Sequence, residues 1–303
     1  MLVYSEKTSG NEMKLLYFPG CTLKTSAKNL EKSAYAVMEA LGHELVEMKD
    51  WNCCGVVASL TDDDLMHHLA PLRNLVHVED QGENKVVALC DMCYNTLKQT
   101  SLRVKEKPED LETLNLFMDR ENDYKGTVEV IHFLEFLRDD VGFDVIKKMV
   151  KNPLKGIKIM PYYGCMLLRP REVAIDDAEE PTILRDLLTA LGAEAVDNPF
   201  KIECCGSYHT IDEKEIVSKR AYRITNYALE RDAEAMVLSC PLCKYNIDVR
   251  GKEAEKMFEG YKQIPVYYYT QLIAVALGLN PKVCGFDQHA VDPTLLLKKK
   301  GVL

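Results

Sequence analysis

Asn52-Cys53-Cys54-Gly55 and Glu203-Cys204-Cys205-Gly206 decide the fold, because the same pattern occurs twice, about 150 residues apart. In each copy one cysteine precedes the pair and a Cys-x-x-Cys motif follows it. The first half reads C-x31-CC-x35-C-x2-C, and the second reads C-x38-CC-x34-C-x2-C. Five cysteines in one order, found twice, indicate an internal duplication. The duplicated cysteines are Cys21, Cys53, Cys54, Cys90, Cys93, Cys165, Cys204, Cys205, Cys240 and Cys243.

The predicted secondary structure repeats with the cysteines. Apolar runs at 14–18 and 157–162 predict buried strands that end at a cysteine, and runs at 85–89 and 235–238 predict strands that lead into Cys-x-x-Cys. Strands that alternate with helices indicate parallel sheets covered by helices. The other strands are expected at 43–48, 128–131, 193–196 and 266–269, the helices at 27–41, 62–80, 181–191 and 213–231, and a helical insertion with a loop at 105–126.

We therefore predict an α/β protein with two pseudo-symmetric, duplicated domains, each a small, mainly parallel sheet with flanking helices. The boundary is expected near Lys151-Asn152-Pro153. Residues 1–12 would form an N-terminal extension, 13–150 the first domain and 151–303 the second. Sites in such sheets assemble at the carboxyl ends of the strands, so cysteines far apart in the sequence should converge in space.

Composition and charge narrow the class of protein. The chain of 303 residues has 11 cysteines and a net charge of −9, which argues against a nucleic-acid binder and against docking on an anionic membrane. The first residues do not resemble a signal peptide, and the longest weakly polar stretch, 266–279, is too short to span a bilayer. We expect a cytoplasmic protein whose reduced thiols bind metal rather than form disulfides.

The number of cysteines in each half distinguishes between metals. A structural zinc ion takes four ligands, so five thiolates exceed its needs, and neighbouring cysteines suit two metal atoms of one cluster better than one ion. Ordinary cubane clusters also take four cysteines. The pattern therefore favours an open, irregular iron–sulfur cluster in each half. Zinc and a metal-free redox dithiol are the alternatives, although the dithiol explains only the Cys-x-x-Cys pairs.

From Met13 onward the doubled pattern resembles the cysteine-rich CCG domains of the B subunit of heterodisulfide reductase from methanogenic archaea. The resemblance implies that each CCG domain holds a non-cubane [4Fe–4S] cluster. It also implies that the disulfide of coenzyme M and coenzyme B is reduced to two thiols between the two clusters. The spacer between Cys205 and Cys240 is one residue shorter than usual, which a loop can absorb. The implied ligands are Cys21, Cys53, Cys54, Cys90 and Cys93 for one cluster and Cys165, Cys204, Cys205, Cys240 and Cys243 for the other.

The resemblance also implies partner subunits. These are a ferredoxin-like C subunit and a flavin-containing A subunit, with a hydrogenase or formate dehydrogenase beyond them. The chain has no dinucleotide-binding or P-loop motif, so its electrons must come from another protein. CCG domains also occur in organic-acid dehydrogenases and thiol:fumarate reductases, so an electron-relay subunit is the alternative function. A zinc-stabilised scaffold is the third.

The substrate implied by the resemblance carries a sulfonate and a phosphate, so we expect cations near the cysteines. Lys24 and Arg169 are favoured because each follows the first cysteine of its half by three or four residues, and Lys201 precedes the second CCG motif. His209 is the candidate proton donor to the product thiolates. Solvated surface charges are the alternative for the three cations, and a supporting hydrogen bond or a plain loop position is the alternative for His209. Two further cations lie next to the motifs, Arg171 and Lys244.

Overall fold

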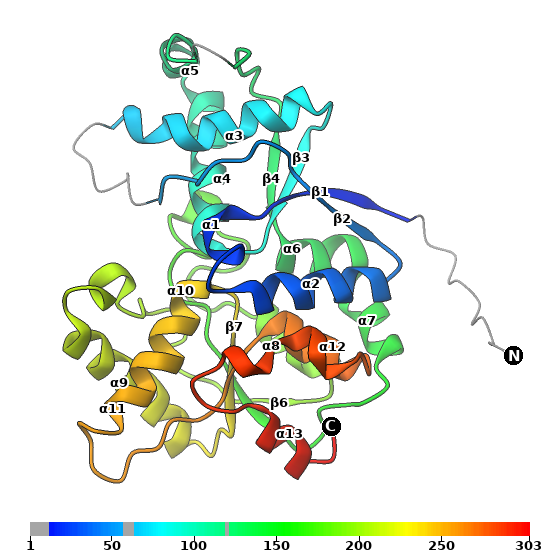
Figure 1. Ribbon diagram of the computed structural model, residues 1–303, viewed down its shortest axis with the longest axis vertical. Coiled ribbons are helices and arrows are strands. Elements are labelled where there is room, and N and C mark those ends of the chain that lie inside the picture. The colour runs from blue at the N-terminus through cyan, green and yellow to red at the C-terminus, as the bar shows by residue number, and fades with distance from the viewer. Residues whose placement is uncertain (1–11, 57–63, 119–120) are drawn as a thin grey trace, which may run out of the picture.

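The computed structural model describes residues 12–56, 64–118 and 121–303, and it contains two parallel four-stranded sheets (Figure 1). The strand orders are β2-β1-β3-β4 and β6-β5-β7-β8, which are the same order in the two halves. The predicted α/β fold and its duplication are therefore confirmed. The strands are β1 (Lys14–Phe18), β2 (Glu44–Glu47), β3 (Lys85–Ala88), β4 (Glu129–His132), β5 (Lys158–Pro161), β6 (Glu194–Ala195), β7 (Ala235–Leu238) and β8 (Val266–Tyr268).

Helices connect the strands and cover the sheets. The first half contains α1 (Gly20–Leu23), α2 (Lys28–Ala40), α3 (Leu69–Asp80), α4 (Asp91–Glu106), α5 (Pro108–Asn115), α6 (Phe133–Phe136) and α7 (Phe143–Met149). The second contains α8 (Ile183–Ala190), α9 (Lys214–Glu230), α10 (Pro241–Lys244), α11 (Gly251–Ala254), α12 (Tyr269–Ala276) and α13 (Thr294–Lys299). Short 3-10 and π segments are η2 (Met66–His68), η3 (Leu137–Val141), η4 (Arg171–Val173), η5 (Ser207–Thr210), η6 (Tyr245–Arg250), η7 (Pro281–Cys284) and η8 (Phe286–Gln288).

Helices α3 and α4 differ from the prediction. The helix expected at 62–80 is regular only from Leu69, and residues 62–63 lie outside the described part of the chain. Pro71 then falls in the first turn of α3, where its missing amide hydrogen costs nothing. The sequence pattern also missed most of α4, because buried polar residues such as Asn95 and Thr100 obscure its apolar periodicity. The expected insertion at 105–126 contains the end of α4 and all of α5.

The strand order explains why the cysteines gather. β1 pairs in parallel with β2 and β3, and β5 does so with β6 and β7. All cysteine motifs follow the carboxyl ends of these strands. Parallel strands end at the same edge, and the switch points between β1 and β3 and between β5 and β7 are where such sheets bind ligands.

The halves pack through helices. In each half, the first long helix contacts a helix near the C-terminal end of the other half. Helix α2 packs against α12, and α8 packs against α7 (Figure 1). At the first contact the hydroxyls of Ser33 and Thr270 lie 2.7 Å apart, and both residues are fully buried. The division at residue 151 stays a prediction. In the described part of the chain, no helix is long and apolar enough to cross a membrane.

We expect Ser33→Ala to lower the free energy of unfolding by about 1–3 kcal/mol, because the Thr270 hydroxyl loses its buried partner across the two halves. Urea denaturation followed by circular dichroism measures the change. Thr189→Ala is the matched control, since this exposed hydroxyl bonds only to Arg185 O of its own helix at 2.9 Å. A loss no larger than that of the control would contradict the prediction.

Candidate metal centres

Glycines let the first cysteine loop of each half approach the Cys-x-x-Cys motif. Gly20 and Gly164 both have positive φ, +65° and +67°. A Cβ atom would lie 2.9 Å from Cys93 Sγ at the first position and 3.0 Å from Cys243 Sγ at the second. A side chain would therefore collide with the sulfur as well as strain the backbone. The same constraint in both halves explains why each loop reads Gly-Cys.

The glycine of each CCG motif seats the paired cysteines against a helix. Gly55 and Gly206 have φ of +76° and +106°, and their Cβ atoms would lie 2.8 Å from Ala70 Cβ on α3 and 2.9 Å from Val217 Cγ2 on α9. No larger residue fits at either position without a shift of the loop or the helix. The CCG motif is therefore a packing motif as well as a donor of two thiols.

The five thiols of the first half form a continuous series of contacts. Cys21 Sγ lies 3.8 Å from Cys53 Sγ. Cys54 shares hydrogen bonds with both Cys53 and Cys93, and Cys93 also contacts Cys90. Cys21 and Cys53 are exposed and the other three thiols are buried. Residues spread over more than 70 positions are thus brought to one place.

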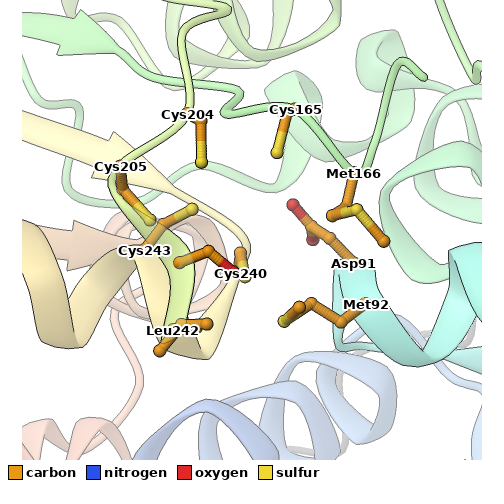
Figure 2. A pocket seen from close by; sticks show the side chains of 10 residues that line it. Asp91, Met92, Cys165, Met166, Cys204, Cys205, Cys240, Leu242 and Cys243 are labelled. Atoms are coloured by element: carbon orange, nitrogen blue, oxygen red, sulfur yellow. The ribbon is translucent and has the colours of Figure 1, made fainter. Parts of the chain in front are cut away.

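The second half repeats this series in the corresponding order. Hydrogen bonds link Cys165 to Cys204, Cys204 to Cys205, Cys205 to Cys243 and Cys243 to Cys240. These sulfurs surround a small cavity of about 20 Å³, which is room for about one water molecule (Figure 2). The cavity is also lined by Asp91, Met92, Met166, Ser207 and Leu242.

The donor set suits a cluster better than a single ion. The five sulfurs of each half follow one another in a series, which fits several metal atoms held together better than one ion. All 11 cysteines are free thiols, so none is withdrawn into a disulfide.

One thiol in each half has a pKa below its ordinary value. Hydrogen bonds from Cys53 and Cys93 lower the pKa of Cys54 to about 4. In the second half, hydrogen bonds from Cys165 and Cys205 hold the pKa of Cys204 well below its ordinary value. The same hydrogen bonds raise the pKa of the partner thiols Cys53, Cys93 and Cys165, so metal binding would have to displace their protons.

The two cysteine sites meet at Asp91, the residue after Cys90. Its Oδ2 accepts a 2.9 Å hydrogen bond from Ser239, the residue before Cys240. Its Oδ1 lies 3.2 Å from His132 Nε2, without the alignment of a hydrogen bond. All three side chains are almost completely buried. The Cys-x-x-Cys motifs of the two halves are therefore tied to each other directly, and Figure 2 shows Asp91 and Met92 reaching the second site from α4.

Helix α4 also holds the loop that follows Cys165. Asn95 Nδ2 donates to Met166 O and Arg169 O, both at 2.7 Å, and Tyr94 Oη donates to Val173 O at 2.8 Å. A helix of the first half thus fixes a loop of the second site. The motif search missed Asp91, Tyr94 and Asn95. Their positions within two residues of Cys93 were the available signal.

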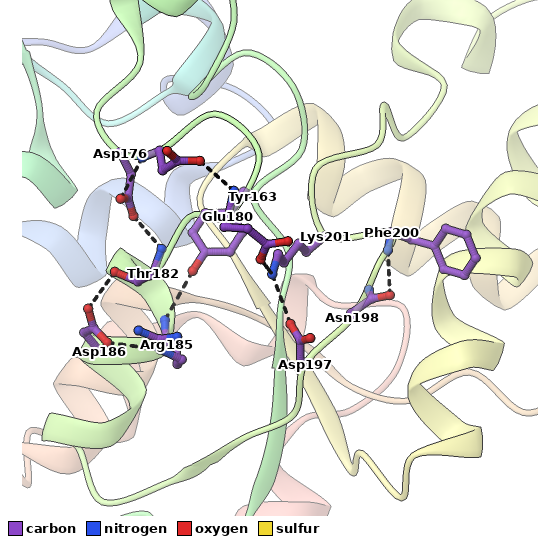
Figure 3. Close-up of polar contacts among 11 residues, drawn as sticks. Tyr163, Asp176, Glu180, Thr182, Arg185, Asp186, Asp197, Asn198, Phe200 and Lys201 are labelled. Atoms are coloured by element: carbon purple, nitrogen blue, oxygen red, sulfur yellow. Dashed lines mark hydrogen bonds and ion pairs between the residues drawn. The ribbon is translucent and has the colours of Figure 1, made fainter.

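The two predicted lysines have close carboxylate partners. Lys24 Nζ lies 2.6 Å from both Glu31 and Glu47. Lys201 Nζ lies 2.7 Å from Glu180 and 3.0 Å from Asp197, at a separate surface pocket (Figure 3). Neither lysine lines the cavity beside the second-half cysteines. Their proposed role toward a substrate stays a prediction.

The other two predicted residues are more open. Arg169 has a side chain that is 47% exposed, with Glu179 Oε1 3.3 Å from its Nη2. His209 lies on η5, exposed, four residues after Cys205. Neither lines the cysteine cavity. Lys244 is buried, bonded to Asp248 at 2.9 Å and to Gln288 O at 2.7 Å, which indicates a structural role.

Both halves match the CCG family, described as a cysteine-rich domain, over residues 15–98 and 159–248. The chain is 31% identical to the 8-methylmenaquinol:fumarate reductase membrane anchor subunit of Wolinella succinogenes, over 94% of this chain and 99% of that protein. It is also 31% identical to the B subunit of the ferredoxin/F420H2-dependent CoB-CoM heterodisulfide reductase of Methanosarcina acetivorans, over 94% of this chain and 96% of that protein. These relatives support an iron–sulfur subunit of an oxidoreductase complex.

A solved structure shows the same fold. A hypothetical protein from Helicobacter pylori superposes with a TM-score of 0.72 at 12% identity, over 93% of this chain and 52% of that one. At this identity the likeness concerns the fold alone. The fold thus persists where most of the sequence differs.

We expect Cys53→Ala and Cys204→Ala each to remove about half of the bound iron, because each half has a complete set of thiolate donors. Cys284→Ala is the control, since this buried thiol lies outside both sets, 3.8 Å from Gln271 O. Iron and acid-labile sulfide analysis of the anaerobically purified proteins measures the change. Loss of all iron from either still-folded ligand variant would show that the two sites are not independent.

Proposed function

The chain belongs to the cysteine-rich CCG domain family, and we propose that it is the catalytic subunit of a heterodisulfide reductase. The proposed reaction converts the disulfide of coenzyme M and coenzyme B, with two electrons and two protons, into two thiols. The observation that supports this most is the pairing of two complete five-cysteine sites through Asp91 and Ser239. The relatives named as B subunits of CoB-CoM heterodisulfide reductases support the choice of substrate.

We assign one non-cubane [4Fe–4S] cluster to each set of five cysteines. When bound, such clusters supply electrons one at a time, so two of them match the two-electron demand of a disulfide. The residues around the second site would position the reacting sulfurs and exclude water, since Met92, Met166 and Leu242 present apolar walls.

Among the predicted cations, Arg169 is best suited to a sulfonate or phosphate. Its single carboxylate contact is long, and half of its side chain is exposed. Its backbone is held by Asn95, so the base of the side chain is fixed beside the second site. Lys24 and Lys201 remain proposed secondary contacts, which would first have to leave their carboxylate partners. His209, exposed on η5, remains the proposed proton donor.

Arg169→Gln should weaken binding of the disulfide about 10- to 150-fold, because a charge-assisted contact contributes about 1.5–3 kcal/mol. The affinity is measured by titration of the iron-loaded protein, and its absorption spectrum should not change. Lys219→Gln, which removes an exposed cation paired with Glu215, serves as the control for net charge. Equal affinities in the two variants would remove Arg169 from the substrate site.

The electron donors follow from the same proposal. We propose that a ferredoxin-like C subunit and a flavin-containing A subunit deliver electrons, with a hydrogenase or formate dehydrogenase behind them. Relatives named as subunits of heterodisulfide reductase complexes support the existence of partner subunits.

A second candidate is an electron-relay subunit of a fumarate reductase-type complex. It is favoured by the Wolinella succinogenes relative, which matches as much of the chain at the same identity. A turnover assay separates the two. The protein with about eight irons is supplied with a reduced viologen dye and then with the coenzyme M–coenzyme B disulfide. Thiol formation coupled to dye oxidation is the expected result. Full iron content with no disulfide turnover would favour the relay, and zinc in place of iron would overturn both.

A further inference from the structure

Asn246 makes a contact that distinguishes the second cysteine site from the first. Its Nδ2 lies 3.3 Å from Cys205 Sγ and 3.0 Å from Ser207 O. The side chain is fully buried on η6, the π-helical segment that follows α10. An amide N–H is therefore aimed at one sulfur of the CCG pair from inside the protein.

The orientation of this amide is determined by its neighbours. Ser207 O is a carbonyl and can only accept, so the atom 3.0 Å from it must be the nitrogen. Asn246 Oδ1 has no hydrogen-bond partner among the described atoms. The amide thus acts as a donor, and Cys205 Sγ is its acceptor.

The first half has no corresponding donor at the equivalent position. The offset between the Cys-x-x-Cys motifs places Thr96 opposite Asn246. Thr96 lies in the regular helix α4, and its hydroxyl donates to Met92 O of the same helix at 2.8 Å. The second half thus has a π-helical turn at Tyr245–Arg250 where the first half has a regular helix, and π segments often occur at functional sites.

Arg220 supports the same pair of cysteines at the backbone. Its Nε donates to Cys204 O at 2.9 Å, and its Nη2 lies 3.4 Å from Glu203 Oε2, so its charge is paired. The feature that acts on sulfur is therefore the amide of Asn246. Hydrogen bonds to ligand sulfur stabilise the more negative, reduced form of an iron–sulfur cluster, and so raise its reduction potential.

We infer that Asn246, by donating its amide hydrogen to Cys205 Sγ, raises the reduction potential of the second-half cluster. This donor acts on the second-half cluster alone, since Thr96 at the equivalent position of the first half bonds to its own helix. This inference rests on the proposed function, because it takes Cys205 as a cluster ligand. It adds a residue that tunes the cluster without binding it.

Redox titration of the anaerobically purified full chain, followed by electron paramagnetic resonance, tests the inference. We expect Asn246→Leu, which keeps a similar volume and removes the donor, to lower the midpoint potential of one cluster and leave the other unchanged. The affected cluster should be the one whose signal is lost in Cys204→Ala. The wild type and Asn246→Leu are compared at the same site, with and without the donor. Other differences between the two halves therefore do not affect the result.

Two matched controls separate tuning from loop support. Thr96→Val alters the equivalent position of the first half, where no shift is expected. Thr210→Val removes the 2.8 Å hydrogen bond from Arg250 Nε and weakens the same η5 turn without touching a sulfur. An unchanged potential in iron-replete Asn246→Leu, or an equal shift in Thr210→Val, would overturn the inference.

The outcome is separable from that of the proposed function. A selective shift in a protein that fails to reduce the disulfide would support the role of Asn246 and reject the disulfide reductase. Normal disulfide turnover with no shift in the midpoint potential would support the disulfide reductase and reject the role of Asn246. Wild-type protein that binds no iron under reconstitution would overturn both.

Discussion

The parallel pairing of β1 with β3 and of β5 with β7 is the constraint on which both cysteine sites depend. Parallel strands deliver their following loops to one edge, and each half uses that edge for all five of its thiols. Gly20 and Gly164 then allow the loop after the first strand to touch the Cys-x-x-Cys sulfur. An antiparallel arrangement of the same motifs would have sent the thiols to opposite edges.

Helix α4 couples the sites to one another. It starts inside the first Cys-x-x-Cys motif, bonds Ser239 through Asp91, and fixes the loop after Cys165 through Asn95. The second half is therefore not an independent copy, since part of its site is supported by the first. This arrangement leaves little freedom for the two sites to separate, because the bonds are buried and costly to break.

Duplication gave both halves the same five cysteines but not the same surroundings. Asp91 corresponds to Pro241, and Thr96 corresponds to Asn246. The first site has two exposed thiols, whereas no second-site thiol is exposed. Two sites with the same cysteines thus differ in their access to solvent and in the polar residues around them.

The sequence by itself determined the duplication, the thiol donors and most strands and helices, because spacing and apolar periodicity are properties of the chain alone. It predicted the strand at Lys14–Phe18 to the residue. It failed for α4, where buried polar side chains hid the apolar period. Only the tertiary structure decided which polar residues surround the sites. Lys24 and Lys201 form ion pairs with carboxylates. The cysteine loops are hydrogen-bonded by Asp91, Asn95 and Asn246. These partners lie on segments that only folding brings together.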